Sequence, residues 1–199
     1  GPAFTFLIFF RTSKTSGGMQ ILDAGSGSNF IHSLSSGGDL FYRWIDTNGA
    51  FPLPIGSFVD TLNDGAVHSL LVNADRTSGR RQIVVDRTAL LNDTGYATAF
   101  DLRFVDLGFG ARSTSGSSPD TFFEGEFWGL WFDNAAYDVV TNLNTFVNAD
   151  NTPADLGADG SAPGAQPLVY APDGNPGTNL GTGGNATVVG SPTTVSRPT

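Results

Sequence analysis

The stretch Phe123-Glu-Gly-Glu-Phe-Trp-Gly-Leu-Trp-Phe-Asp-Asn-Ala-Ala-Tyr137 decides the fold of this chain. A glycine follows the opening turn, apolar residues then recur from Phe127 to Phe132, and Asp133-Asn134 supplies a second turn. An apolar run of this length between turn residues predicts a β-strand.

Strand patterns also dominate the rest of the chain. Both faces of the segment from Phe4 to Phe10 are largely apolar, which predicts a central strand covered on both sides. Glycine-rich turns separate the segments, and Ser36-Gly37-Gly38-Asp39 is expected to close a hairpin. Strands are expected at Met19–Ala24, Phe30–Leu34, Leu40–Asp46, Val67–Ala74, Arg81–Asp86, Asp101–Phe109 and Phe123–Phe132. The fold class is therefore predicted to be all-β, an antiparallel β-sandwich, with one or two helical turns near Leu143, Phe146 and Val147.

Composition narrows the functional classes. The 199 residues are 39% hydrophobic with 16 Phe, enough for a substantial core. The net charge of −9 argues against a nucleic-acid partner. There are no cysteines, which removes disulfides, thiolate catalysis and cysteine-based zinc sites. The apolar run from Ala3 to Phe10 is too short to span a bilayer, so membrane insertion is not expected.

Three segments are expected from the composition. Gly1-Pro2 has the character of a tag remnant, residues 3–147 form the β-sandwich, and residues 148–199 are rich in Gly, Pro and Asn. The last segment is either a disordered tail or an irregular segment packed on the same domain. Pro167–Tyr170 and Ala186–Val189 have the pattern of short strands, which favours the packed alternative.

Two motifs carry a resemblance to a known family. The Phe123–Tyr137 stretch resembles the last signature strand of the laminin-G-like, concanavalin A-like lectin/glucanase superfamily. Asp64–Val72 resembles a second strand of these domains, and Arg81–Asp86 resembles its hairpin partner. Val67 stands where the family usually has Trp, and Arg87 where it usually has Gly, which puts the turn type there in doubt. The resemblance implies a concanavalin A-like jelly roll and leaves the ligand open, because the superfamily holds lectins, hydrolases, adhesion modules and structural domains.

The style of the C-terminal segment is similar to that of laminin-G-like modules in tail-fibre, spike and head-decoration proteins of tailed phages and gene-transfer particles. That resemblance implies a virion or extracellular surface location, host recognition through bacterial surface glycan, and virion structural proteins as further partners. Spike and fibre modules are often multimeric, so a homo-oligomer is also a candidate state.

Aromatic residues give the main ligand-binding hypothesis. Tyr42 and Trp44 share one face of their expected strand, and Trp128 and Trp131 stand at motif positions that are usually polar. Sugar rings pack their C–H faces on such side chains while planar polar groups bond the hydroxyls. The alternative is that these rings form the core or are buried against another segment or subunit. The candidate ligand-binding residues are Tyr42, Arg43, Trp44, Asp46, Arg103, Arg112, Trp128 and Trp131.

Catalytic and metal signals are weaker. Glycan hydrolases need two carboxyl groups on one face, and Glu124 and Glu126 are the only glutamates. No acidic residue lies between them, and the family pattern places both before the strand, so we expect solvated carboxylates and no enzyme. His68 falls where the family has a structural His. Loop oxygens at Asp39 and Asp133-Asn134 make Ca²⁺ a candidate cofactor, with turn-capping as the alternative.

The sequence thus supports a non-catalytic carbohydrate-binding adhesion module as the first hypothesis. A structural or oligomerisation domain is the second, and a glycan hydrolase is the third.

Overall fold

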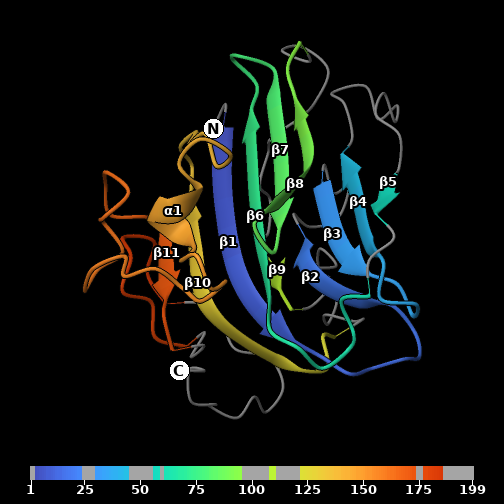
Figure 1. Ribbon diagram of the computed structural model, residues 1–199. Coiled ribbons are helices and arrows are strands. Elements are labelled where there is room, and N and C mark those ends of the chain that lie inside the picture. The colour runs from blue at the N-terminus through green and yellow to red at the C-terminus, as the bar shows by residue number, and fades with distance from the viewer. Residues whose placement is uncertain are drawn as a thin grey trace, which may run out of the picture. The chain divides into compact units, whose positions relative to one another are not determined.

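In the computed structural model, residues 3–23, 30–44, 56–58, 61–95, 108–110, 122–173 and 177–185 are described, with only the backbone of residues 30–32, 43–44 and 56–58. Nearly every element is a strand, and the strands form two antiparallel sheets. The predicted all-β fold class, an antiparallel β-sandwich, is confirmed. The chain divides into two compact units, which are described one at a time (Figure 1).

The first unit comprises Gly1–Phe10, Val67–Gly95 and Glu126–Thr199 and holds a six-stranded sheet. Its strand order is β11-β10-β1-β6-β7-β8, and Figure 1 shows β1 between β10 and β6. The strands are β1 (Ala3–Arg11), β6 (His68–Asp75), β7 (Arg80–Val85), β8 (Thr88–Asp93), β10 (Glu126–Asp133) and β11 (Val169–Ala171). The predicted central position of the first strand is confirmed, since eight of its nine residues are buried.

The second unit comprises Arg11–Ala66 and Tyr96–Gly125 and holds a five-stranded sheet of order β5-β4-β3-β2-β9. Its strands are β2 (Met19–Asp23), β3 (Phe30–Leu34), β4 (Leu40–Trp44), β5 (Gly56–Phe58) and β9 (Gly108–Phe109). The predicted hairpin is confirmed, because β3 pairs with β4 in antiparallel register. The short strands β5 and β8 were not anticipated from the sequence pattern. The Asn48-Gly49 turn and most of the expected strand Asp101–Phe109 lie outside the described residues.

One face of the six-stranded sheet is covered by the chain that follows β10. A single apolar cluster joins sheet residues to residues of that later segment, which also supplies the one-turn helix α1 (Leu143–Phe146). The cluster contains Leu7, Phe9, Leu71, Val84, Trp128, Trp131, Val139, Phe146, Val147, Leu156 and Tyr170. Burial of this many apolar side chains is the main term that stabilises the unit.

Gly129 explains how two tryptophans of β10 reach this one cluster. Residues three apart on a regular strand face opposite sides, yet Trp128 and Trp131 both lie in the cluster. Gly129 between them has φ +62°, which interrupts the alternation. A Cβ added there would lie 2.8 Å from Phe9 Cδ2, so a side chain has neither the conformation nor the space.

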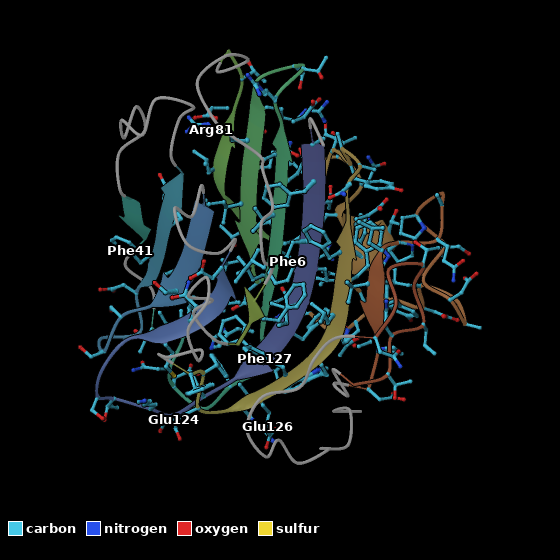
Figure 2. All side chains as sticks on the ribbon, turned by 180° about the vertical axis from the view of Figure 1, so that it is seen from behind. Phe6, Phe41, Arg81, Glu124, Glu126 and Phe127 are labelled. Atoms are coloured by element: carbon cyan, nitrogen blue, oxygen red, sulfur yellow. The ribbon has the colours of Figure 1, made fainter. Side chains whose placement is uncertain are left out.

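The opposite face of the sheet is also apolar. Phe4, Phe6 and Ile8 alternate with the cluster residues along β1 and are at most 1% exposed, and Phe6 is labelled in Figure 2. Phe4 stacks on Phe132 with ring centroids 6.1 Å apart. Both faces of β1 are therefore buried.

Candidate functional site

Trp131, a predicted ligand-binding residue, belongs to the core. Its side chain is fully buried, and its ring meets those of Tyr137 and Phe146 edge to face, with centroids 5.4 Å apart in both pairs. Its Nε1 donates a hydrogen bond to the carbonyl oxygen of Gly160 at 2.9 Å. The apolar ring of Trp131 is thus packed against other rings, and its polar Nε1 atom is hydrogen-bonded.

Trp128 and Tyr42 are also buried, at 0% and 6% exposure. Three of the predicted ligand-binding residues thus have no open ring face, and a sugar cannot stack on them in this structure. The hydrophobic effect explains the correction, because large rings in a phenylalanine-rich sandwich gain most when removed from water. The alternative assignment as core residues applies to Trp128 and Trp131.

The other predicted residues are not placed by the structure. Arg43 and Trp44 have a described backbone in β4, but their side chains lie outside the described part. Asp46, Arg103 and Arg112 lie outside the described residues altogether. Their proposed contact with glycan stays a prediction.

A polar cluster at the β7–β8 turn centres on Asp86. His68 Nδ1 lies 2.6 Å from Asp86 Oδ2, while Oδ1 accepts from the Ser69 backbone N–H and from Asn151 Nδ2, both at 2.8 Å. Burial alone would raise the pKa of Asp86, but these hydrogen bonds and the attraction to His68 outweigh it, so the pKa lies below its ordinary value. The carboxylate of Asp86 is therefore ionised, and both of its oxygens already have hydrogen-bonding partners.

This arrangement is structural. Ser69 Oγ donates to Asn151 Oδ1 at 2.7 Å, so the hydroxyl is not hydrogen-bonded to the imidazole as a serine nucleophile would be. His68 is only 7% exposed. The cluster links the turn to the segment around Asn151, and the structural role implied for His68 agrees with this position.

Arg87 shows how the turn adapts to the absence of the usual glycine. Asp86 and Arg87 have φ +46° and +66°, a left-handed pair that suits a tight hairpin turn. The Arg87 guanidinium donates to the carbonyl oxygens of Val147 and Asn148, at 2.6 and 2.9 Å, and to Asn144 Oδ1 at 2.7 Å. These bonds offset the strain of a side chain in the left-handed region.

A second polar cluster centres on Asp138. Its Oδ1 accepts from Gln82 Nε2 at 2.8 Å and from the Thr141 backbone N–H at 3.0 Å, and its Oδ2 lies 3.2 Å from Arg80. Burial raises the pKa of Asp138, and the bonds from Thr141 and Gln82 with the charge of Arg80 lower it below its ordinary value. Gln82 Oε1 also accepts from the Val139 backbone N–H at 3.0 Å. The polar atoms of this cluster bind the covering segment to the sheet.

The second unit carries a differently built feature, which we call the Thr12–Glu124 corner (Thr12, Lys14, Asn63, Phe122 and Glu124). Thr12 Oγ1 donates to the Glu124 carbonyl oxygen at 2.6 Å and accepts from the Lys14 backbone N–H at 3.1 Å. Asn63 Nδ2 donates to the Lys14 carbonyl oxygen at 3.0 Å. Lys14 and Glu124 form an ion pair through their side chains. Glu124 is labelled in Figure 2, on the loop before β10.

The corner leaves two side chains facing solvent. Phe122 is 44% exposed, and the Glu124 side chain is 68% exposed. Phe122 was missed in the sequence because it precedes the family motif and follows no strand periodicity. Its only signal was the pair Phe122-Phe123 beside a glutamate, and Phe123 is the more buried of the two.

The two glutamates are not matched as a catalytic pair would be. Glu124 precedes β10 and is paired with Lys14, whereas Glu126 is the first residue of β10 itself. The expectation that both glutamates precede the strand is wrong for Glu126, which is the first residue of β10.

The candidate calcium ligands Asp39 and Asp133 form hydrogen bonds within turns. Asp133 Oδ1 accepts from the Asn134 backbone N–H at 2.9 Å, and Asp39 Oδ2 lies 3.3 Å from Ser35 Oγ. Burial raises the pKa of Asp133, and burial with the charge of Asp133 raises that of Tyr137. Within the described ranges, no group of three or more His, Cys, Asp or Glu side chains could hold a metal ion. Among the same residues, no helix is long and apolar enough to cross a membrane.

Comparison with known proteins adds the fold relatives. No protein-family model matches the chain, and no curated protein matches it. Among solved structures, a candidate carbohydrate-binding protein from Bacteroides ovatus aligns over 89% of this chain, with a TM-score of 0.61 and 14% identity. The alignment takes in 47% of that protein, so this chain spans about half its length.

Two further structures cover about two thirds of the chain. The CBM40 module of the Ruminococcus gnavus IT-sialidase aligns over 69% of this chain and 78% of its own, with a TM-score of 0.53 and 14% identity. Another structure of that module has α2,6 sialyllactose bound. The SAP-like pentraxin of Limulus polyphemus aligns over 70% of this chain and 69% of its own, with a TM-score of 0.50 and 15% identity. At these identities the likeness establishes the fold alone, an antiparallel β-sandwich.

Proposed function

We propose that this chain is a non-catalytic carbohydrate-binding module. The observation that carries the proposal is the alignment of 89% of the chain with a candidate carbohydrate-binding protein. The bound sialyllactose of the Ruminococcus gnavus module adds that a related fold binds sugar. A fold alone does not fix a function, so the site chemistry must agree.

The described chemistry agrees with binding better than with catalysis. A retaining hydrolase needs two carboxyl groups about 5–5.5 Å apart, one of them as acid. Glu124 is instead highly exposed and neutralised by Lys14. The polar clusters around Asp86 and Asp138 use their atoms to hold the chain together.

The finer form of the proposal concerns the biological setting. The resemblance of the C-terminal segment to modules of phage and gene-transfer particles supports an adhesion role on a particle or extracellular surface. Its ligand there is a bacterial surface polysaccharide, and virion structural proteins are its neighbours. Oligomerisation would increase the avidity of such a module.

The test is a binding screen of the purified chain against bacterial capsular and surface polysaccharides and defined oligosaccharides, with and without a chelator. Saturable binding by a protein whose fold is confirmed by circular dichroism supports the proposal. Loss of binding in the presence of chelator would show that the binding requires a bound metal ion such as Ca²⁺. Silence across a broad panel would contradict the proposal and favour the structural or oligomerisation role, for which sedimentation of the same sample gives the first evidence.

A further inference from the structure

Exposure separates two large hydrophobic side chains from the others in the described part of the chain. Phe122 is 44% exposed in the five-stranded unit, and Leu180 is 41% exposed in the six-stranded unit. Only Phe122 offers an aromatic face, to which the C–H groups of a sugar ring are complementary. It also precedes an exposed carboxylate by two residues, which places the two Cα atoms within about 7 Å.

The backbone that carries Phe122 and Glu124 is fixed on both sides. The Phe123 backbone N–H donates to the Gly110 carbonyl oxygen at 2.7 Å, and the Glu124 carbonyl oxygen accepts from Thr12 Oγ1. At Gly125 an added Cβ would collide with the Arg11 carbonyl oxygen, so the chain there is packed against backbone. A surface that is already ordered loses little conformational entropy when a ligand binds.

The ion pair prepares Glu124 as an acceptor. Lys14 Nζ contacts Glu124 Oε1, and the Lys14 backbone is itself held by Thr12 and Asn63. The carboxylate is thereby oriented, and with a side chain 68% exposed it retains lone pairs for hydroxyl donors. An exposed aromatic ring two residues from an exposed carboxylate supplies both kinds of group that saccharide sites use, an apolar surface and a polar acceptor.

The charge of the corner determines whether it favours neutral or acidic saccharides. The chain carries a net charge of −9, and the lysine of the corner is already neutralised by Glu124. A carboxylate on the ligand would meet like charge with no uncommitted cation among the five corner residues.

We infer that the Thr12–Glu124 corner binds a neutral saccharide, with a sugar ring stacked on Phe122 and its hydroxyls donating to Glu124. This inference rests on the proposed function and assigns it a place and a ligand class. It also moves the ligand from the buried tryptophans of the six-stranded unit to a surface of the other unit.

The experiment compares Phe122→Ala with Leu180→Ala, a matched control of nearly equal exposure. Both variants and the wild type are titrated with the saccharides that the wild type binds, and with lactose and sialyllactose as a neutral and acidic pair. We expect Phe122→Ala to weaken binding about tenfold and Leu180→Ala to leave it unchanged. The wild type should bind lactose, the neutral member of the pair, more tightly than sialyllactose, the acidic member.

A second variant, Glu124→Gln, tests the charge. It should weaken binding of neutral sugars, because a carboxylate acceptor becomes an amide, and it should narrow their advantage over acidic ones, because the charge of Lys14 is no longer neutralised. If the wild type binds sugar and Phe122→Ala binds as well as Leu180→Ala, the inference is wrong and the proposed function stands. Tighter binding of acidic sugars also overturns the inference. If the folded wild type binds no saccharide, both are overturned.

Discussion

The surroundings of Trp131 in the six-stranded unit and the Thr12–Glu124 corner in the five-stranded unit use aromatic side chains in opposite ways. Trp131 is fully buried, bonded through Nε1 and in contact with two further rings. Phe122 keeps nearly half its surface in water on a backbone fixed by its neighbours. The difference teaches that a buried ring contributes to the free energy of unfolding, while an exposed ring on an ordered loop is available to a ligand.

The largest effect should come from Trp131→Ala. The substitution removes a ring from the apolar cluster and leaves the Gly160 carbonyl oxygen without its donor, so we expect a loss of about 3–5 kcal/mol in unfolding free energy. Urea denaturation followed by circular dichroism measures it. A loss below about 1 kcal/mol would mean that the covering segment does not depend on this ring.

Asp86→Asn should cost less, about 1–3 kcal/mol at neutral pH, because a partly buried acceptor of three hydrogen bonds is weakened. The pKa of Asp86 is depressed in the folded chain, so its contribution is present above the ordinary value of 3.8 and is lost as pH falls below it. The wild type should therefore lose stability on acidification below pH 3.8 more steeply than the variant.

Denaturation at a series of pH values tests this expectation. The control is Asp155→Asn, an exposed aspartate whose Oδ1 accepts a hydrogen bond from the Gly157 backbone N–H. A control curve that loses its pH dependence as Asp86→Asn does would assign the effect to net charge.

Substitutions of Arg87 should change the unfolding free energy less, and by different amounts for Gly and Ala. Arg87→Gly loses three hydrogen bonds but removes the left-handed strain, so the net change should stay within about 1 kcal/mol. Arg87→Ala loses the same bonds and keeps the strain, so it should be about 1 kcal/mol less stable than Arg87→Gly. Equal melting temperatures for the two variants would show that strain at this turn is negligible.

Phe122→Ala should have the smallest effect on stability, within about 0.5 kcal/mol, because it removes an exposed ring. Together with its expected loss of sugar binding, this outcome would separate recognition from folding. A large drop in melting temperature would instead place the ring in the core of the unit and weaken the comparison with Trp131.

Much of the architecture could be predicted from the sequence because it follows from period and turn chemistry. The apolar faces of Phe4–Phe10 required a central strand, and the turn at Ser36–Asp39 required a hairpin. The strand β8 was missed because its residues, Thr-Ala-Leu-Leu-Asn-Asp, lack clear alternation, and its pairing with β7 shifts register between Ile83 and Val84. A register shift of this kind has no signature in hydrophobicity alone.

The candidate site was harder to predict. Trp128 and Trp131 looked like surface positions because the family motif is usually polar there. The left-handed Gly129 between them turns both into the same buried cluster. The backbone around Phe122 is placed by contacts with Arg11, Thr12 and Gly110, which are distant in sequence. Tertiary placement of this kind cannot be read from a window of neighbouring residues.

The packing of Leu156 and Tyr170 into the apolar cluster has a consequence for protein production. The change in composition near Asn148 invites an expression boundary at that point, yet both residues lie in the same apolar cluster as Trp131. Asn179 also holds β11, because its Oδ1 accepts a hydrogen bond from the Tyr170 backbone N–H at 2.8 Å. A fragment that ends at residue 147 would expose the apolar cluster to water, so it should aggregate and be recovered from inclusion bodies. A fragment that extends through Asn185 keeps these contacts.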